Sequence, residues 1–117
     1  MWLLRPKRES PPQPEPYYDD VVTVNSREQL PEQLGRKIFI IKRNGRNRWA
    51  ILACPCGCGD RIEANLMKSI YPHWKLRRHR SAVSLSPSLW VSPDRCGSHF
   101  KLVANRVLWV NLNDSRW

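Results

Sequence analysis

The segment ACPCGCGD places three cysteines at alternate positions, and the fourth cysteine of the chain lies far downstream, three residues before a histidine. Thiolates and imidazoles are the preferred ligands of zinc, which structural sites hold in tetrahedral sets of four, often from two loops distant in sequence. Glycines beside the cysteines let the backbone fold closely around an ion. The spacing therefore predicts a Zn²⁺ site with five candidate ligands, Cys54, Cys56, Cys58, Cys96 and His99.

Five candidates compete for four positions. One cysteine is spare, or His99 only supports the ligands, or one position is filled differently; the spacing does not choose. A closed set of four protein ligands would make the metal structural, whereas three ligands would leave a position for a reactive water. Asp60 and Glu63 are the nearest bases for such an open site. Because no HExxH pattern accompanies them, we expect Asp60 to hydrogen-bond the loop and Glu63 to face solvent.

The serines at positions 84, 86, 88 and 98 raise the question of a nucleophile. No G-x-S-x-G elbow is present, and no acid–base partner is evident beside them in the sequence. Hydrogen bonding to backbone at turns is therefore the predicted role of Ser84, Ser86, Ser88 and Ser98.

The cellular compartment is predicted from the absence of two signals. No stretch approaches the ~20 apolar residues that cross a bilayer, and the apolar run in the opening MWLLRPKRE is too short for a secretory signal. We therefore expect a cytoplasmic protein without membrane contact. Clustered cysteines in a reducing compartment bind metal more often than they form disulfides.

The chain is basic, with 20 Lys and Arg against 10 Asp and Glu and a net charge of +10. Residues 36–80 hold twelve of the basic residues and only two acidic ones, Asp60 and Glu63. This region would attract an acidic partner, so nucleic-acid binding through residues 36–80 is a minority prediction.

The elements that must position these residues are mostly strands. Residues 1–20 are rich in proline and predict a flexible N-terminal segment, so the zinc-binding β domain is expected over residues 21–117. Within it, Ser26 followed by Gln29 is a capping-box pattern, and Pro31 limits the helix that it begins to a short one.

Alternating and β-branched runs at 38–41, 49–52, 61–66, 99–103 and 107–110 predict strands, and shorter period-two segments lie at 74–76 and 83–85. Asn44-Gly45 and Asn105-Arg106 are the predicted turns of two hairpins. Four tryptophans, Trp49, Trp74, Trp90 and Trp109, lie in or beside such runs and are expected in the core. The predicted fold class is mainly β: a small antiparallel domain, like a zinc ribbon or barrel, with one short N-terminal helix.

Several short motifs resemble a bacterial family catalogued as domain of unknown function number 6527. They are CPCGCG at 54–59, Pro72-x-Trp74, Ser84-Leu85-x-Pro87-Ser88, Cys96-x-Ser98-His99-Phe100 and the late Trp109. The likeness covers about residues 36–110. It implies a metal-binding protein encoded near bacterial ubiquitin-like conjugation genes, among activating enzymes, conjugating enzymes and peptidases, often in defence neighbourhoods.

Three functions follow as hypotheses. The first is a zinc-stabilised adaptor that binds a ubiquitin-like protein or a conjugation enzyme. The second is a zinc-dependent peptidase acting on ubiquitin-like proteins. The third is a zinc ribbon that binds nucleic acid. The coordination of the metal is the observation that separates a scaffold from a metalloenzyme.

Overall fold

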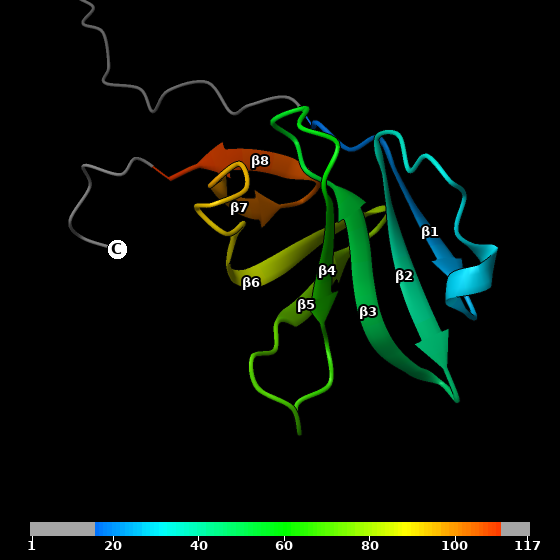
Figure 1. The fold of residues 1–117 in the computed structure, drawn as a ribbon. Coiled ribbons are helices and arrows are strands. Elements are labelled where there is room, and N and C mark those ends of the chain that lie inside the picture. Colours follow the sequence, from blue (N-terminus) through cyan, green and yellow to red (C-terminus); the bar gives the residue numbers. More distant parts are fainter. Residues whose placement is uncertain (1–15, 111–117) are drawn as a thin grey trace, which may run out of the picture.

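A computed structural model describes residues 16–110, which form eight strands in two four-stranded sheets (Figure 1). The first sheet contains β1 (Asp20–Val24), β2 (Lys37–Arg43), β3 (Arg46–Ala53) and β4 (Arg61–Asn65). The second contains β5 (Lys75–His79), β6 (Ala82–Trp90), β7 (His99–Val103) and β8 (Arg106–Trp109). Strands that follow one another in the chain are neighbours in each sheet.

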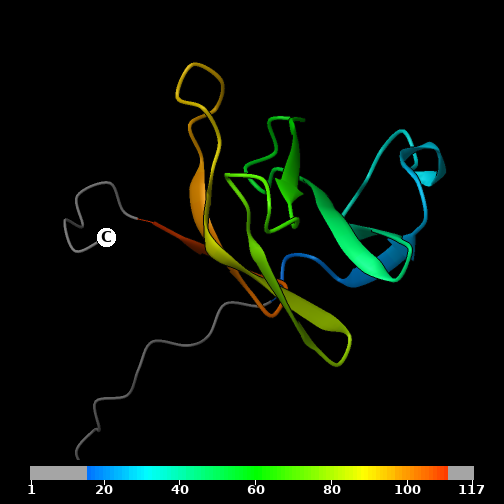
Figure 2. The same ribbon diagram turned by 90° about the horizontal axis from the view of Figure 1, so that it is seen from below.

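The main core lies between the two sheets, which appear as separate layers in Figure 2. Alternate residues along each strand point to the same face, so β2, β3 and β4 bury one set of side chains against those of β6 and β7. The fully or almost fully buried members are Tyr18, Ile38, Ile40, Ala50, Leu52, Ala64, Val83, Leu85, Leu89, Phe100 and Leu102.

A second apolar cluster covers the other face of the first sheet. It consists of Leu34, Phe39, Ile41 and Ile51, with Leu30 packed against it. Residues 25–34 therefore close this face, and β2 is buried on both sides. This explains why the strand reads as a continuous apolar run instead of an alternating one. The second sheet has no such cluster on its outer face within residues 16–110, which leaves that face to solvent.

The predicted N-terminal helix is wrong. Only Arg27–Gln29 forms a helical element, a single turn of 3₁₀ helix, and the Ser26 side chain makes no capping hydrogen bond. Leu30 is extended, with ψ of 138°, because the following Pro31 disfavours the helical conformation in the residue before it. The fold is mainly β as expected, but it is a pair of stacked sheets and β1 runs parallel to β2.

The two predicted hairpins are confirmed. β2 and β3 pair antiparallel around Asn44 and Gly45, whose φ angles of 53° and 75° fit the turn that an Asn-Gly pair favours. β7 and β8 pair around Ala104 and Asn105, so this turn lies one residue before the predicted Asn105-Arg106. The Asn105 side chain accepts a hydrogen bond from Val83 N–H at 2.9 Å and so joins this turn to β6.

The predicted flexible segment 1–20 falls largely outside the described residues, and its flexibility stays a prediction. Of its last residues, Tyr18 is fully buried, and its hydroxyl donates a 2.6 Å hydrogen bond to the carbonyl oxygen of Ala53. No helix within residues 16–110 has the length and apolar character that crossing a membrane requires.

Candidate active site and metal site

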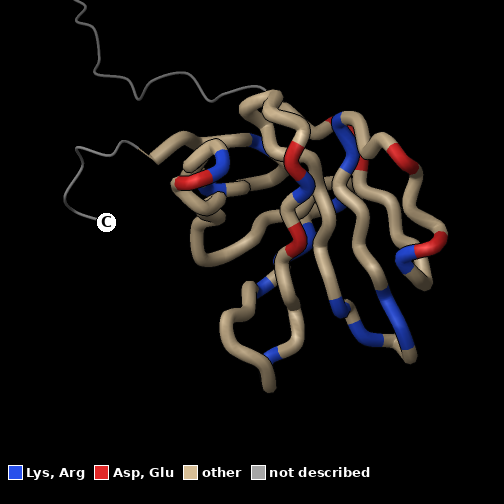
Figure 3. The backbone as a smooth tube through the Cα atoms, in the orientation of Figure 1, with Lys and Arg blue, Asp and Glu red and all other residues tan. Residues whose placement is uncertain are grey.

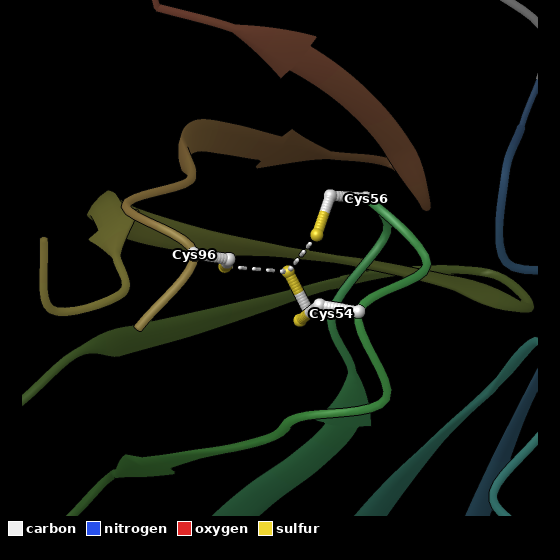
Figure 4. A group of neighbouring side chains, drawn as sticks. Cys54, Cys56 and Cys96 are labelled. Carbon is white, nitrogen blue, oxygen red and sulfur yellow. Dashed lines mark hydrogen bonds between the residues drawn. The ribbon is translucent and has the colours of Figure 1, made fainter. Parts of the chain in front are cut away.

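The four cysteines come together at one end of the two sheets. Cys54, Cys56 and Cys58 lie on the turn between β3 and β4, and Cys96 lies on the loop between β6 and β7. Their sulfur atoms all lie within 4.8 Å of one another. Figure 4 shows the sulfur of Cys54 between those of Cys56 and Cys96. The cluster therefore joins a loop of the first sheet to a loop of the second.

The sulfur positions fit a tetrahedral metal ion. The Cys54 sulfur is 3.5 Å from that of Cys56 and 3.7 Å from that of Cys96. Four thiolates at ~2.3 Å from zinc would lie ~3.8 Å apart, whereas a disulfide needs ~2.05 Å. All four cysteines are free thiols. The cluster could therefore hold a metal ion, and four thiolates would fill its coordination sphere.

The turn that carries three of these cysteines depends on its glycines. Gly57 and Gly59 have φ angles of 89° and 88°, which side chains rarely allow. The turn is closed by a hydrogen bond from Cys54 N–H to the carbonyl oxygen of Asp60 at 2.9 Å. Asp60 N–H points back to the sulfur of Cys58 at 3.4 Å, the type of contact that offsets thiolate charge.

Ser98 favours the thiolate form of two of the four cysteines, Cys56 and Cys96. Its hydroxyl is hydrogen-bonded to the sulfur of Cys96 at 3.2 Å. Hydrogen bonding by Ser98 lowers the pKa of Cys56 to about 6 and also lowers the pKa of Cys96. Burial instead raises the pKa of Cys54. Metal ions bind the deprotonated thiol, so the lowered pKa values of Cys56 and Cys96 favour metal binding by these two side chains.

The two acidic residues that follow the cysteine turn, Asp60 and Glu63, both bind arginine side chains. The Asp60 carboxylate accepts two hydrogen bonds from the Arg95 guanidinium, at 2.9 and 2.6 Å, and so ties the two cysteine loops together. The bond to Arg95 also lowers the pKa of Asp60. Glu63 forms an ion pair with Arg27. Neither carboxylate belongs to the metal-binding group formed by the described residues.

His99, the fifth candidate ligand, is not part of the sulfur cluster. Its Nε2 atom lies 2.7 Å from the hydroxyl oxygen of Ser88, within hydrogen-bonding distance. Ser88 therefore has in space the acid–base partner that the sequence did not reveal. A serine hydroxyl bonded to an imidazole is the nucleophile–base arrangement of serine hydrolases.

An irregularity in β6 presents Ser88 to this histidine. Leu85 pairs with Leu102 of β7 and Leu89 pairs with Phe100, so residues 86–88 of β6 stand opposite a single residue of β7. The extra residues interrupt the ladder, and such bulges re-aim side chains next to active sites. The Trp74 indole N–H donates a 3.2 Å hydrogen bond to the Ser88 carbonyl oxygen and so stabilises the bulge.

Trp90 orients the histidine ring. It is the direct cross-strand partner of His99, and the two rings stack with centroids 4.3 Å apart and an interplanar angle of 3°. The expected core position of Trp90 is wrong, because 60% of its surface is exposed. Trp109 is also 54% exposed, against the same expectation, whereas Trp49 and Trp74 are partly buried.

The second ring nitrogen of His99, Nδ1, lacks within residues 16–110 the carboxylate partner that it would have in a catalytic triad. His99 Nδ1 is buried, and no described residue forms a hydrogen bond with it. A second serine–histidine contact joins His79 Nε2 to Ser84 Oγ at 2.9 Å on the same sheet face. Ser84 Oγ also accepts the backbone N–H of Ala104, so it fulfils the predicted structural role of a serine.

Period-two alternation contained a signal for the Ser88–His99 pair. Ser88 and Trp90 alternate with the core residue Leu89, and His99 precedes the core residue Phe100, so both strands direct their polar members outward. Proximity to Cys96 in sequence favoured a ligand role for His99 instead. In the structure Ser98 is buried beside the sulfurs, while the next side chain turns to the opposite side.

Comparison with known proteins adds an independent observation. No curated protein and no solved structure matches the chain. A family model described as bacterial ubiquitination-like system serine protease (BubE) matches residues 26–110, which is most of the chain and includes the four cysteines, Ser88 and His99. This agrees with the ubiquitin-like context that the resemblance implied, although it does not carry that family's number. The chain belongs to the family of bacterial ubiquitination-like system serine proteases, BubE.

Proposed function

We propose that this protein is a serine protease of a bacterial ubiquitination-like system, with Ser88 as nucleophile and His99 as general base. The observation that carries the proposal is the 2.7 Å contact between Ser88 Oγ and His99 Nε2 on the open face of the second sheet. The family description independently names the same chemistry. Ser88 is only partly buried, so a peptide can reach it.

The chemistry follows from the two side chains. With the proton of the neutral imidazole on Nδ1, His99 Nε2 accepts the hydroxyl proton while Ser88 Oγ attacks the carbonyl carbon of the scissile peptide bond. The imidazolium then gives that proton to the departing amine, and an acyl-enzyme remains. A water molecule, deprotonated by the same Nε2, hydrolyses the ester and restores Ser88.

The structure supports a dyad in which stacking replaces the usual carboxylate. In a triad, an acidic residue bonded to the second nitrogen holds the imidazole in position. Here His99 Nδ1 has no acceptor among the described residues, and the parallel Trp90 ring restrains the imidazole plane instead. The electron-rich indole face also stabilises the imidazolium that forms when the proton moves.

The cysteine cluster is proposed to hold Zn²⁺ as a structural ion. Four sulfurs at tetrahedral spacing leave no position for a reactive water, which argues against a zinc-dependent peptidase. The ion would fix the loop that carries Cys96, three residues before His99. Its contribution to catalysis is therefore to hold the base against Ser88.

Two other hypotheses from the sequence receive less support. A pure adaptor has no need of a serine–imidazole contact on an open sheet face. Nucleic-acid binding through residues 36–80 stays a prediction: Figure 3 shows Lys and Arg at the free end of the β2–β3 hairpin and elsewhere on both sheets, with acidic residues between them. Ubiquitin-like proteins or their conjugates are the proposed substrates, in a cytoplasmic setting.

The test is covalent labelling with a fluorophosphonate, which reacts with activated serines. We expect one adduct, which mass spectrometry of tryptic peptides maps to Ser88. Ser88→Ala and His99→Ala should abolish labelling, whereas the control Ser81→Ala, at an exposed turn, should keep it. An adduct on Ser84, or the absence of any adduct on folded protein, would contradict the proposal. Cleavage of a ubiquitin-like protein fused at its C-terminus to a reporter then tests the substrate.

A further inference from the structure

The serine lies at one end of a groove on the outer face of the second sheet. The groove has a volume of about 660 Å³ and runs over β5, β6 and β7. Its described lining contains no Asp or Glu, but it contains Lys75, Arg77 and Lys101. Ser88 belongs to the same lining, so whatever occupies the groove is close to the nucleophile.

The basic residues of β5 that line the groove lie at alternate positions of the strand. Lys75 is the cross-strand partner of Ser86, and Arg77 is the partner of Ser84. Lys75 and Arg77 are two residues apart on the regular strand β5, or ~7 Å at ~3.3 Å per residue. The bulge at residues 86–88 makes their distance from Ser88 shorter than it would be along an extended strand. Side chains of an extended peptide also point to the same side at every second residue.

The spacing of the groove therefore matches a strand-like substrate with charges at alternate positions. We propose that the groove binds an extended acidic segment of the protein substrate, whose carboxylates, at alternate positions on one side of the cleaved bond, face Lys75 and Arg77. This inference rests on the proposed function, since it takes Ser88 as the point of cleavage. The charge of the chain, +10, favours such a substrate at long range as well.

The pocket on the other side of Trp90 does not offer the same complementarity. It is lined by Asp60 and Glu63 together with Arg61 and Arg95. Its two acidic groups already form ion pairs, Asp60 with Arg95 and Glu63 with Arg27. The mixed charge of this pocket selects neither sign of ligand, whereas the described lining of the groove over β5 contains Lys and Arg but no Asp or Glu.

The experiment measures how peptides slow the labelling of Ser88 by a fluorophosphonate in the full-length protein. One competitor is an octapeptide of alternating Ala and Glu, and the other is an octapeptide of alternating Ala and Lys. We expect the acidic peptide to slow labelling about fivefold more than the basic one at low salt, a ratio typical of two exposed ion pairs. The ratio should fall as salt is added.

Two variants assign the effect to the groove. Lys75→Glu with Arg77→Glu should remove or reverse the preference, and Lys75→Gln with Arg77→Gln should remove it with a smaller charge change. The matched control, Lys42→Glu with Arg43→Glu, makes the same charge change at exposed positions of the first sheet and should keep the preference.

The outcomes separate this inference from the proposed function. Labelling that both peptides slow equally overturns the acidic-substrate inference alone and leaves the protease proposal standing. A preference that survives both groove variants also overturns the inference. If wild-type protein is not labelled at Ser88 at all, the proposed function fails and the inference fails with it.

Discussion

The Trp90 indole and the His99 imidazole are stacked, with centroids 4.3 Å apart and an interplanar angle of 3°. Neighbouring antiparallel strands bring these two residues directly opposite each other. The indole lies against the face of the imidazole, whereas the carboxylate of a triad would bond Nδ1 in the plane of the ring. The proposed contribution of Trp90 to catalysis is therefore to hold the imidazole in position. Substitutions of Trp90 should disturb that position.

Trp90→Ala should lower kcat about tenfold while it changes KM little, because the imidazole loses the surface that restrains it. Since Trp90 is 60% exposed, the melting temperature should change little. Trp90→Phe keeps an aromatic face and should recover most of the activity. Steady-state kinetics checks this, with the exposed Tyr71→Ala as the control. An equal loss in the Phe variant would contradict a stacking role.

His99→Gln should remove activity but leave metal content unchanged, because the four sulfurs gather without the imidazole. Metal analysis of purified protein, beside a melting curve, makes this measurement. The metal content decides whether His99 is one of the four ligands among the five candidates. A variant that loses one equivalent of zinc would return His99 to the ligand set, in conflict with its contact to Ser88.

Cys96→Ser should release the metal, lower the melting temperature and abolish labelling of Ser88 together. The substitution removes the only sulfur that the second sheet contributes to the cluster, and a metal site that forms only in the folded chain stabilises that chain. Ser88→Ala is the matched comparison, since it should lose labelling alone. Full labelling in a metal-free Cys96→Ser protein would separate the two sites and contradict their coupling.

Tyr18→Phe should cost ~1–2 kcal/mol of unfolding free energy near neutral pH, because the buried carbonyl of Ala53 loses its donor. Burial raises the pKa of Tyr18 above its usual 10.0. The unfolded chain therefore ionises first, and the stability that Tyr18 contributes is present below pH ~10 and lost as pH rises above it. Chemical denaturation of the wild-type and Tyr18→Phe proteins from pH 8 to 11 should show the difference between their unfolding free energies decreasing. A difference that stays constant to pH 11 would contradict this account.

Local patterns were sufficient to predict the hairpins. The Asn44-Gly45 pair favours the turn between two apolar runs because both residues tolerate positive φ angles. The turn of the β7–β8 hairpin likewise contains an asparagine, Asn105, with positive φ. The gathering of the cysteines was also foreseeable, since free thiols at two distant loops have few other reasons to coexist. The 3₁₀ turn at Arg27–Gln29 shows the limit of a capping pattern when a proline follows closely.

The Ser88–His99 contact was beyond local reasoning. It depends on how many residues of β6 stand opposite one residue of β7, and that register comes from packing of the core residues Leu85 and Leu89 against Leu102 and Phe100. Alternation shows which side chains share a face, but it does not show which of them meet across strands. Sequence proximity to Cys96 favoured a ligand role for His99, whereas the structure places its Nε2 beside Ser88.

Only two residues separate Cys96 from His99, so one short segment serves both the sulfur cluster and the proposed dyad. Cys56 and Cys58 are exposed, which leaves the cluster open to reagents. If the cluster holds the proposed ion, alkylation of these thiols or removal of the ion by a chelator would free the segment and displace the histidine. Under the proposed mechanism, inhibitor profiling would then place the protein among cysteine proteases or metalloproteases, although neither a thiol nor a metal takes part in the proposed cleavage. Its mechanistic class has to be assigned from the residue that carries the acyl group.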